Sequence, residues 1–140
     1  MRILAFDFGI KHIGVAVGQT ITQTAEPLTT LVNNPEMGPE IKKLLAYWSP
    51  QKIIIGLPLN MDGSEQELTL LAKHFADTLQ AYSPLSIEWV DENLSTWEAK
   101  QALNLPYRGK ITKNQAQQLN AQAAVIIAED WLKRSTSTSE

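Results

Sequence analysis

The chain has 140 residues, of which 44% are hydrophobic and 19% charged, and this composition suits one globular domain with a single core. Its net charge of -3 excludes overall electrostatic attraction to nucleic acid, so any such binding needs a local basic patch. The lack of cysteine excludes disulfides, thiol nucleophiles and zinc ribbons. No apolar run approaches the length of a membrane span. We expect a cytoplasmic protein with one domain over residues 1–133 and a disordered tail over residues 134–140.

The N-terminal part of the sequence predicts three strands in an antiparallel meander. Residues 3–9 and 12–18 are apolar runs, and the turn between them is so short that only a hairpin can join them. A third strand is expected at about 28–32, where Pro27 requires a sheet edge or a bulge. Gly14, inside the second run, indicates close approach of another backbone or a ligand.

The rest of the chain alternates between helical and strand patterns. Capping boxes of Ser64 with Glu67, Ser95 with Glu98 and Thr112 with Gln115 are expected to open three of the helices. The order predicts an α/β fold with a mixed five-stranded sheet, an antiparallel meander plus parallel strands, flanked by helices. The expected elements are a helix between Pro39 and Pro50, a strand at 52–58, a helix from 64 to about 82, a strand at 85–90, a helix from 95 to about 103 and a long helix from 112 to about 133.

Asp7 is an acid inside the first apolar run. Alternation puts Leu4, Phe6 and Phe8 on one face of that strand and Asp7 on the other, within a sheet that is covered on both sides. An unpaired carboxylate there would cost several kcal/mol or become protonated. Asp7 is therefore expected to meet a cation, a metal or a cluster of donors. The alternative is that it closes the strand by hydrogen bonding to the turn at Gly9.

Glu92 and Asn120 are the other candidate site residues. In open α/β sheets, sites form at the carboxyl ends of strands, and Glu92 directly follows the last expected strand. Asn120 is a polar residue on the apolar face of the last helix. Converging oxygen ligands are what Mg²⁺ needs. The alternatives are a surface acid for Glu92 and a hydrogen-bonded core amide for Asn120.

The segment 100–113 is the one local excess of positive charge. It contains no acid, and Tyr107 adds a face on which a base could stack. Such a segment could bind phosphates without reading sequence, or it could be a solvated loop. Lys11, beside the Asp7 turn, is a further phosphate-binding candidate or simply exposed, whereas His12 and His74 are expected to be structural or exposed. The nucleic-acid-binding candidates are Lys11, Lys100, Arg108, Lys110 and Lys113.

Four motifs give the chain a resemblance to a known family. They are AFDFG with the following KHIGVAVG, IIGLPLNMDGSE at 54–65, DENLSTWEA at 91–99 and AAVII at 123–127. In this order they resemble the bacterial YqgF/RuvX family, and the resemblance covers residues 1 to about 133.

The resemblance implies an RNase H-like fold and similarity to Holliday-junction resolvases. It also implies a nuclease that matures the 5′ end of pre-16S rRNA during ribosome biogenesis, with acids that bind Mg²⁺ or Mn²⁺. Asp7 matches the family's first acid and Glu92 its second. Two positions depart from the family pattern: Asn120 stands where a third Asp is common, and Asn93 stands where Arg is common.

The expected function is that of a metal-dependent endonuclease, with Asp7, Glu92 and Asn120 as catalytic and metal-binding residues. Because Asn120 lacks the charge of the third acid, the first alternative is a catalytically impaired nucleic-acid-binding protein. The second is a Holliday-junction resolvase. An actin-like ATPase also opens with Asp-x-Gly after a first strand, but 140 residues leave no room for its duplicated domain. The choice between RNA and DNA, the choice of metal and the presence of a homodimer stay open.

Overall fold

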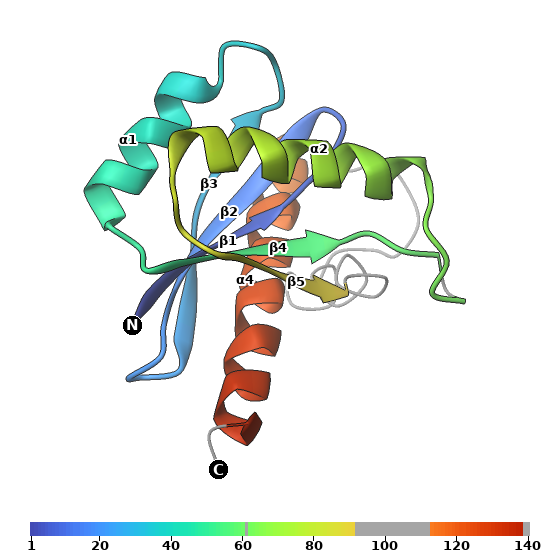
Figure 1. The fold of residues 1–140 in the computed structure, drawn as a ribbon. Coiled ribbons are helices and arrows are strands. Elements are labelled where there is room, and N and C mark those ends of the chain that lie inside the picture. Colours follow the sequence, from blue (N-terminus) through green and yellow to red (C-terminus); the bar gives the residue numbers. More distant parts are fainter. Residues whose placement is uncertain (61, 92–112, 139–140) are drawn as a thin grey trace.

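The sheet has the predicted mixed topology. The structure, a computed structural model, describes residues 1–60, 62–91 and 113–138. The strand order is β3-β2-β1-β4-β5, with β1, β2 and β3 antiparallel and β4 and β5 parallel to β1 (Figure 1). This arrangement confirms the meander and the parallel half. The strands are β1 (Arg2–Asp7), β2 (His12–Gln19), β3 (Thr24–Val32), β4 (Lys52–Leu57) and β5 (Ile87–Asp91).

β3 is an edge strand with an irregularity at the expected place. Val15 of β2 pairs with Thr29, whereas the next residue, Ala16, pairs with Pro27. Leu28 is therefore the extra residue of a bulge, beside the proline that has no N–H to donate. β3 begins earlier than expected, at Thr24, because the hairpin register continues past the bulge to Gln19.

Helices cover both faces of the sheet (Figure 1). α1 (Gly38–Trp48) and α2 (Glu67–Tyr82) pack on one face, over a core cluster that contains Leu4 and Phe6 of β1. α4 (Lys113–Thr138) packs on the other face, where Ile3 and Ala5 lie in a second cluster. The alternation along β1 therefore puts Asp7 on the side of the sheet opposite to Leu4 and Phe6, as the sequence pattern predicted, and this is the side that α4 covers.

Small residues let α4 approach β2 closely. On the α4 face β2 presents Gly14, Ala16 and Gly18, and Ala16 lies in a buried cluster with Ala124. A Cβ built on Gly14 would lie under 3.0 Å from the backbone carbonyl oxygen of Asn120. The close backbone approach that Gly14 predicted is therefore confirmed, and the neighbour is α4.

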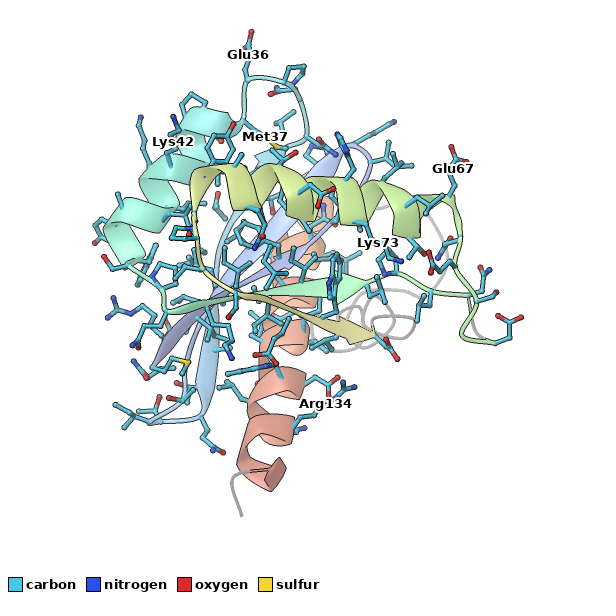
Figure 2. All side chains as sticks on the ribbon, in the orientation of Figure 1. Glu36, Met37, Lys42, Glu67, Lys73 and Arg134 are labelled. Carbon is cyan, nitrogen blue, oxygen red and sulfur yellow. The ribbon has the colours of Figure 1, made fainter. Side chains whose placement is uncertain are left out.

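Two helix boundaries differ from expectation. α2 begins at Glu67, and the backbone N–H of Gln66 donates to Thr69 Oγ1 at 3.0 Å, so the predicted box of Ser64 with Glu67 is wrong. Ser64 forms its hydrogen bond within the preceding loop instead, where its hydroxyl donates to Asp62 Oδ1 at 2.6 Å. α4 continues to Thr138 through most of the segment that we expected to be disordered, and Arg134 pairs with Asp130 at 3.3 Å across one helical turn (Figure 2). The helix expected at 95–103 lies outside the described residues.

Among the helices that the structure describes, none is long and apolar enough to cross a membrane.

A charged cluster joins the sheet to α4 at the end of the sheet opposite Asp7. Lys52 on β4 forms an ion pair with Glu88 on β5, and its ammonium lies 5.6 Å from the centre of the Trp131 ring. The hydrogen bond from Lys52, with a smaller contribution from Trp131, lowers the pKa of the Glu88 carboxyl below its usual value.

Replacing Lys52 by Met is expected to reduce the loss in the free energy of unfolding that occurs as pH falls into the acid range. A carboxyl whose folded pKa is lowered stabilises the protein above its unfolded pKa, and this contribution is lost as pH falls through the folded pKa. Because the pair is partly exposed, we expect a change of about 0.2–1 kcal/mol. Urea denaturation at a series of pH values below neutrality measures it. Lys42→Met is the control, since Lys42 also lies over an aromatic ring, that of Tyr82; an equal pH dependence in both variants would contradict the assignment.

Candidate active site

Asp7 is the last residue of β1, at the carboxyl edge of the parallel strands. β4 beside it ends at Leu57, and β5 ends at Asp91, which pairs with Leu57. The carboxyl ends of β1, β4 and β5 therefore lie at one edge of the sheet, where α/β folds place their sites. Asp7 is partly buried. Glu92 follows Asp91 in the sequence and lies outside the described residues.

The structure brings Asn120 to the same place. Asp7 pairs with Gly14 across the hairpin. Gly14 in turn lies against the backbone of Asn120, as described above. Asn120 is partly buried, between the buried residues Leu119 and Ala121. The packing of α4 on β2 therefore puts the backbone of Asn120 against Gly14, the residue that pairs with Asp7.

The turn after Asp7 is fixed by two features. A Cβ on Gly9 would lie under 3.0 Å from the carbonyl oxygen of His12, so this tight turn requires glycine. Asn33, just after β3, binds the turn from outside: its side-chain amide donates to Gly9 O at 2.8 Å and its backbone N–H donates to Lys11 O at 2.9 Å. The turn presents Lys11, which is exposed beside the candidate site.

Asn33 is a positioning residue that our sequence analysis missed. The available signal was the Asn-Asn-Pro turn at 33–35, which resembled an ordinary loop. Its hydrogen bonds to two residues of the Asp7 turn depend on the pairing of β3 with β2, which brings Asn33 beside the turn.

The Asn33→Ala variant should loosen the turn that carries Lys11. The change leaves the partly buried carbonyl of Gly9 without its side-chain donor, so we expect a loss of about 1–2 kcal/mol in the free energy of unfolding. Asn34→Ala is the matched control, because among the described residues the Asn34 side chain bonds within its own loop, where Oδ1 accepts from Glu36 N–H at 2.9 Å. Thermal unfolding of both variants checks the prediction, and equal stabilities would show that Asn33 does not brace the turn.

The loop after β4 is ordered by its own hydrogen bonds. Thr69 Oγ1 donates to Pro58 O, and Leu59 pairs with Glu65 in an isolated bridge. Hydrogen bonds from the hydroxyl and backbone N–H of Ser64 lower the pKa of the Asp62 carboxyl. This carboxylate is thus held within the loop.

Some of the expected site residues lie within the described part of the chain and others lie outside it. Asp7, Lys11 and Asn120 are described, and Lys113 is the first residue of α4. Lys100, Arg108 and Lys110 lie outside the described residues, together with Glu92. Within the described part of the chain, no three His, Cys, Asp or Glu side chains are grouped so as to hold a metal ion. The roles of these residues in catalysis, metal binding and nucleic-acid binding stay predictions.

Comparison with solved structures defines the class of fold. Thermus thermophilus RuvC matches with a TM-score of 0.58 at 11% identity, covering 99% of this chain and 98% of that chain. The Fowlpox virus resolvase in complex with Holliday junction DNA matches with a TM-score of 0.57 at 10% identity, covering 96% and 99%. The fold is the RNase H-like fold of the RuvC-type resolvases, as expected from the sequence.

Sequence comparison defines the family. The model of the family described as "RuvX: Holliday junction resolvase" matches residues 1–134. A protein of Nitrosococcus oceani is 45% identical over 133 residues, covering 93% of this chain and 85% of its own length, and is named "Putative pre-16S rRNA nuclease". A protein of Pectobacterium carotovorum with the same name is 45% identical over 133 residues, covering 94% of each chain. The chain belongs to the RuvX family, which confirms the predicted resemblance.

Proposed function

We propose that this chain is a divalent-cation-dependent endonuclease that processes the 5′ end of pre-16S rRNA in the cytoplasm. The observation that carries the proposal is the placement of Asp7 at the carboxyl edge of the sheet, with Asn120 brought beside it by the contact of α4 with Gly14. The substrate in this proposal is inferred from the names of the relatives. Residues 1–133 form the nuclease domain in this proposal.

The donor set fits a hard cation. Asp7 and Glu92 would supply carboxylate oxygens and Asn120 an amide oxygen, and these are the ligands that Mg²⁺ and Mn²⁺ accept. A bound divalent cation would activate the attacking water and stabilise the leaving oxygen. Asn120 keeps an oxygen at the third position but lacks its negative charge. We therefore expect a weaker site and slower chemistry than a third acid would give.

The chain's basic residues would hold the substrate. Lys11 is exposed in the turn directly after Asp7, and it would contact a phosphate next to the one that is cleaved. The lysines and arginine between residues 100 and 113 would contact phosphates further along. Such contacts give affinity and register without reading sequence.

The test is a cleavage assay on two substrates, each with Mg²⁺ or Mn²⁺. One is an RNA that carries the 5′ precursor segment of 16S rRNA, and the other is a four-way DNA junction. Cation-dependent cleavage of the RNA supports the proposal, and the EDTA reaction is the control. Cleavage of the junction alone would favour the second candidate, a Holliday-junction resolvase, which the family description and the RuvC-like fold support. Binding without cleavage of either substrate would identify a catalytically impaired nucleic-acid-binding protein.

Asn120→Asp is expected to raise the cleavage rate. The substitution adds a negative charge beside Asp7 with almost no change in side-chain size, so it should strengthen cation binding. We expect an increase of about tenfold or more, where each factor of ten corresponds to about 1.4 kcal/mol of barrier. Single-turnover cleavage at one fixed Mn²⁺ concentration, below saturation for the wild type, measures it. The control is Gln122→Glu, which adds the same charge two residues along the helix; an equal gain from both variants would contradict a role for position 120.

A further inference from the structure

A groove of about 310 Å³ opens beside the turn that follows Asp7. It lies between that turn, the segment after β3 and α2. Phe8 and Phe75 form its floor, with ring centroids 5.3 Å apart. Ile10 and Leu71 line it and are 66% and 41% exposed. Because Phe8 directly follows Asp7, the groove lies at the same end of β1 as Asp7, but it opens on the α2 side of the sheet, whereas Asp7 faces α4.

Polar groups from two elements line the same groove. His74 and Thr78 come from α2, and Asn33 comes from the segment after β3. The Thr78 hydroxyl donates to His74 O at 3.2 Å, so its oxygen can still accept a hydrogen bond. The Asn33 amide nitrogen donates to Gly9 O, so its Oδ1 can likewise accept. The groove thus combines an apolar interior with hydrogen-bonding groups, as sites for small flat ligands do.

The groove continues along α2 rather than ending as an isolated pocket. A second hollow of about 330 Å³ shares Asn33, Met37 and Thr78 with it and reaches Tyr82 (Figure 2, where Met37 is labelled). Tyr82 is 36% exposed, and Lys42 lies over its ring at 5.4 Å from the centre. A path of this kind, with exposed apolar side chains, one exposed aromatic ring and a cation along it, fits a single nucleic-acid strand better than a lone small molecule.

We propose that the groove at Phe8 and Leu71 binds one unpaired base of the substrate, next to the phosphate that is cleaved at Asp7. This inference rests on the proposed nuclease function and deepens it. The flat base would lie against the apolar side chains while its edge hydrogen-bonds with His74, Thr78 or Asn33. Lys11, in the same turn as Ile10, would neutralise the adjoining phosphate.

A groove that binds one base favours substrates in which that base is unpaired. A base within a continuous duplex would have to leave its stack to enter the groove, which costs a few kcal/mol, whereas an unpaired base pays much less. The preferred substrate therefore has single-stranded nucleotides beside the cleaved bond, such as the end of an RNA stem.

The test compares two neighbouring leucines on α2. Leu71 lines the groove, whereas the adjacent Leu70, which is 61% exposed, does not. Leu71→Glu and Leu70→Glu add the same negative charge one residue apart on α2, but only Leu71→Glu adds it within the groove. Affinity is measured by fluorescence anisotropy in EDTA, with a labelled RNA hairpin that carries a single-stranded 5′ extension. We expect Leu71→Glu to bind about tenfold more weakly than Leu70→Glu, as for the loss of one stacked base.

An abasic scan identifies the base itself. Each nucleotide of the extension is replaced in turn by an abasic site. We expect one position to cost the wild type about tenfold and to cost Leu71→Glu almost nothing, because its groove is already blocked. Equal affinities of the two leucine variants, together with no sensitive position, would overturn the proposal. Since these measurements use no divalent cation, they can fail while the cleavage assay succeeds, and the reverse also holds.

Discussion

Replacing Asp7 by Asn is expected to abolish cleavage. One carboxylate about 4 Å from a divalent cation contributes up to about 8 kcal/mol at an effective dielectric constant near 20, before the loss of hydration is subtracted. In this chain the loss is the more severe because position 120 is already an uncharged Asn. We expect the single-turnover rate with Mn²⁺ to fall by roughly a thousandfold or more.

The Asp7→Asn variant should remain folded, since Asp7 is only partly buried and Asn has almost the same size. Its thermal unfolding in EDTA is therefore expected to match or exceed that of the wild type, because a negative charge has been removed from the site. Asp91→Asn is the matched control, because Asp91 also ends a parallel strand, β5. Asp91 alternates to the same side of the sheet as Trp89, which packs against the core cluster under α2. Cleavage by Asp7→Asn at the wild-type rate would show that Asp7 has no catalytic role.

The Gly14→Ala variant is expected to have the largest effect on stability. The added methyl group would meet the Asn120 carbonyl oxygen at well under 3.0 Å, and this obstacle is the backbone of a long helix. Either α4 or β2 must move, and we expect a loss of about 3 kcal/mol in the free energy of unfolding, at the upper end of typical overpacking costs. The same movement separates Asn120 from Asp7, so cation affinity should fall as well.

Gly18→Ala provides the comparison within the same strand and on the same face. There the added methyl group would meet Ile3 Cγ1 at 2.9 Å and Cδ1 at 3.1 Å, which are atoms of one side chain and not of a helix backbone. We expect a cost of about 1 kcal/mol. Urea denaturation measures both variants, and equal costs would contradict the view that α4 rests directly on the backbone of β2 at Gly14.

Local patterns in the sequence were sufficient for most of the sheet. The short turn between the first two apolar runs allowed only a hairpin, and Pro27 required an edge position or a bulge, both of which β3 has. The unbroken apolar run of β4 indicated a strand buried on both faces. These predictions succeeded because each depends on sterics or hydrogen bonding within a few residues.

Predictions that depended on tertiary contacts were less complete. The motif of Ser64 with Glu67 fits a capping box, but the Ser64 hydroxyl donates to Asp62 in the folded loop, and Gln66 is the N-cap of α2 instead. Leu71 has helical spacing with the core residues of α2, yet it is 41% exposed and lines the groove. A side chain at the border of an apolar stripe is buried or exposed according to what packs beside it, which periodicity does not record.

The residues of the candidate site could be predicted from their residue types and from their positions in or at the end of a strand. Asp7 stood out because an acid in an apolar run is costly, and Gly14 because it interrupts a strand. Gly14 pairs with Asp7 and contacts Asn120. This link could not be predicted without the register of the hairpin and the placement of α4. Asn33 was missed for the same reason, since its partners are more than 20 residues away in sequence.

Calorimetric titration with Mn²⁺ tests the central claim most directly, namely that Asp7 and Asn120 share one cation site. The titration uses the wild type, Asp7→Asn and Asn120→Asp under identical conditions. We predict measurable binding by the wild type, no detectable binding by Asp7→Asn and at least tenfold tighter binding by Asn120→Asp. Unchanged Mn²⁺ affinity in both variants would contradict the account, because neither residue would then contribute to a cation site at this edge of the sheet.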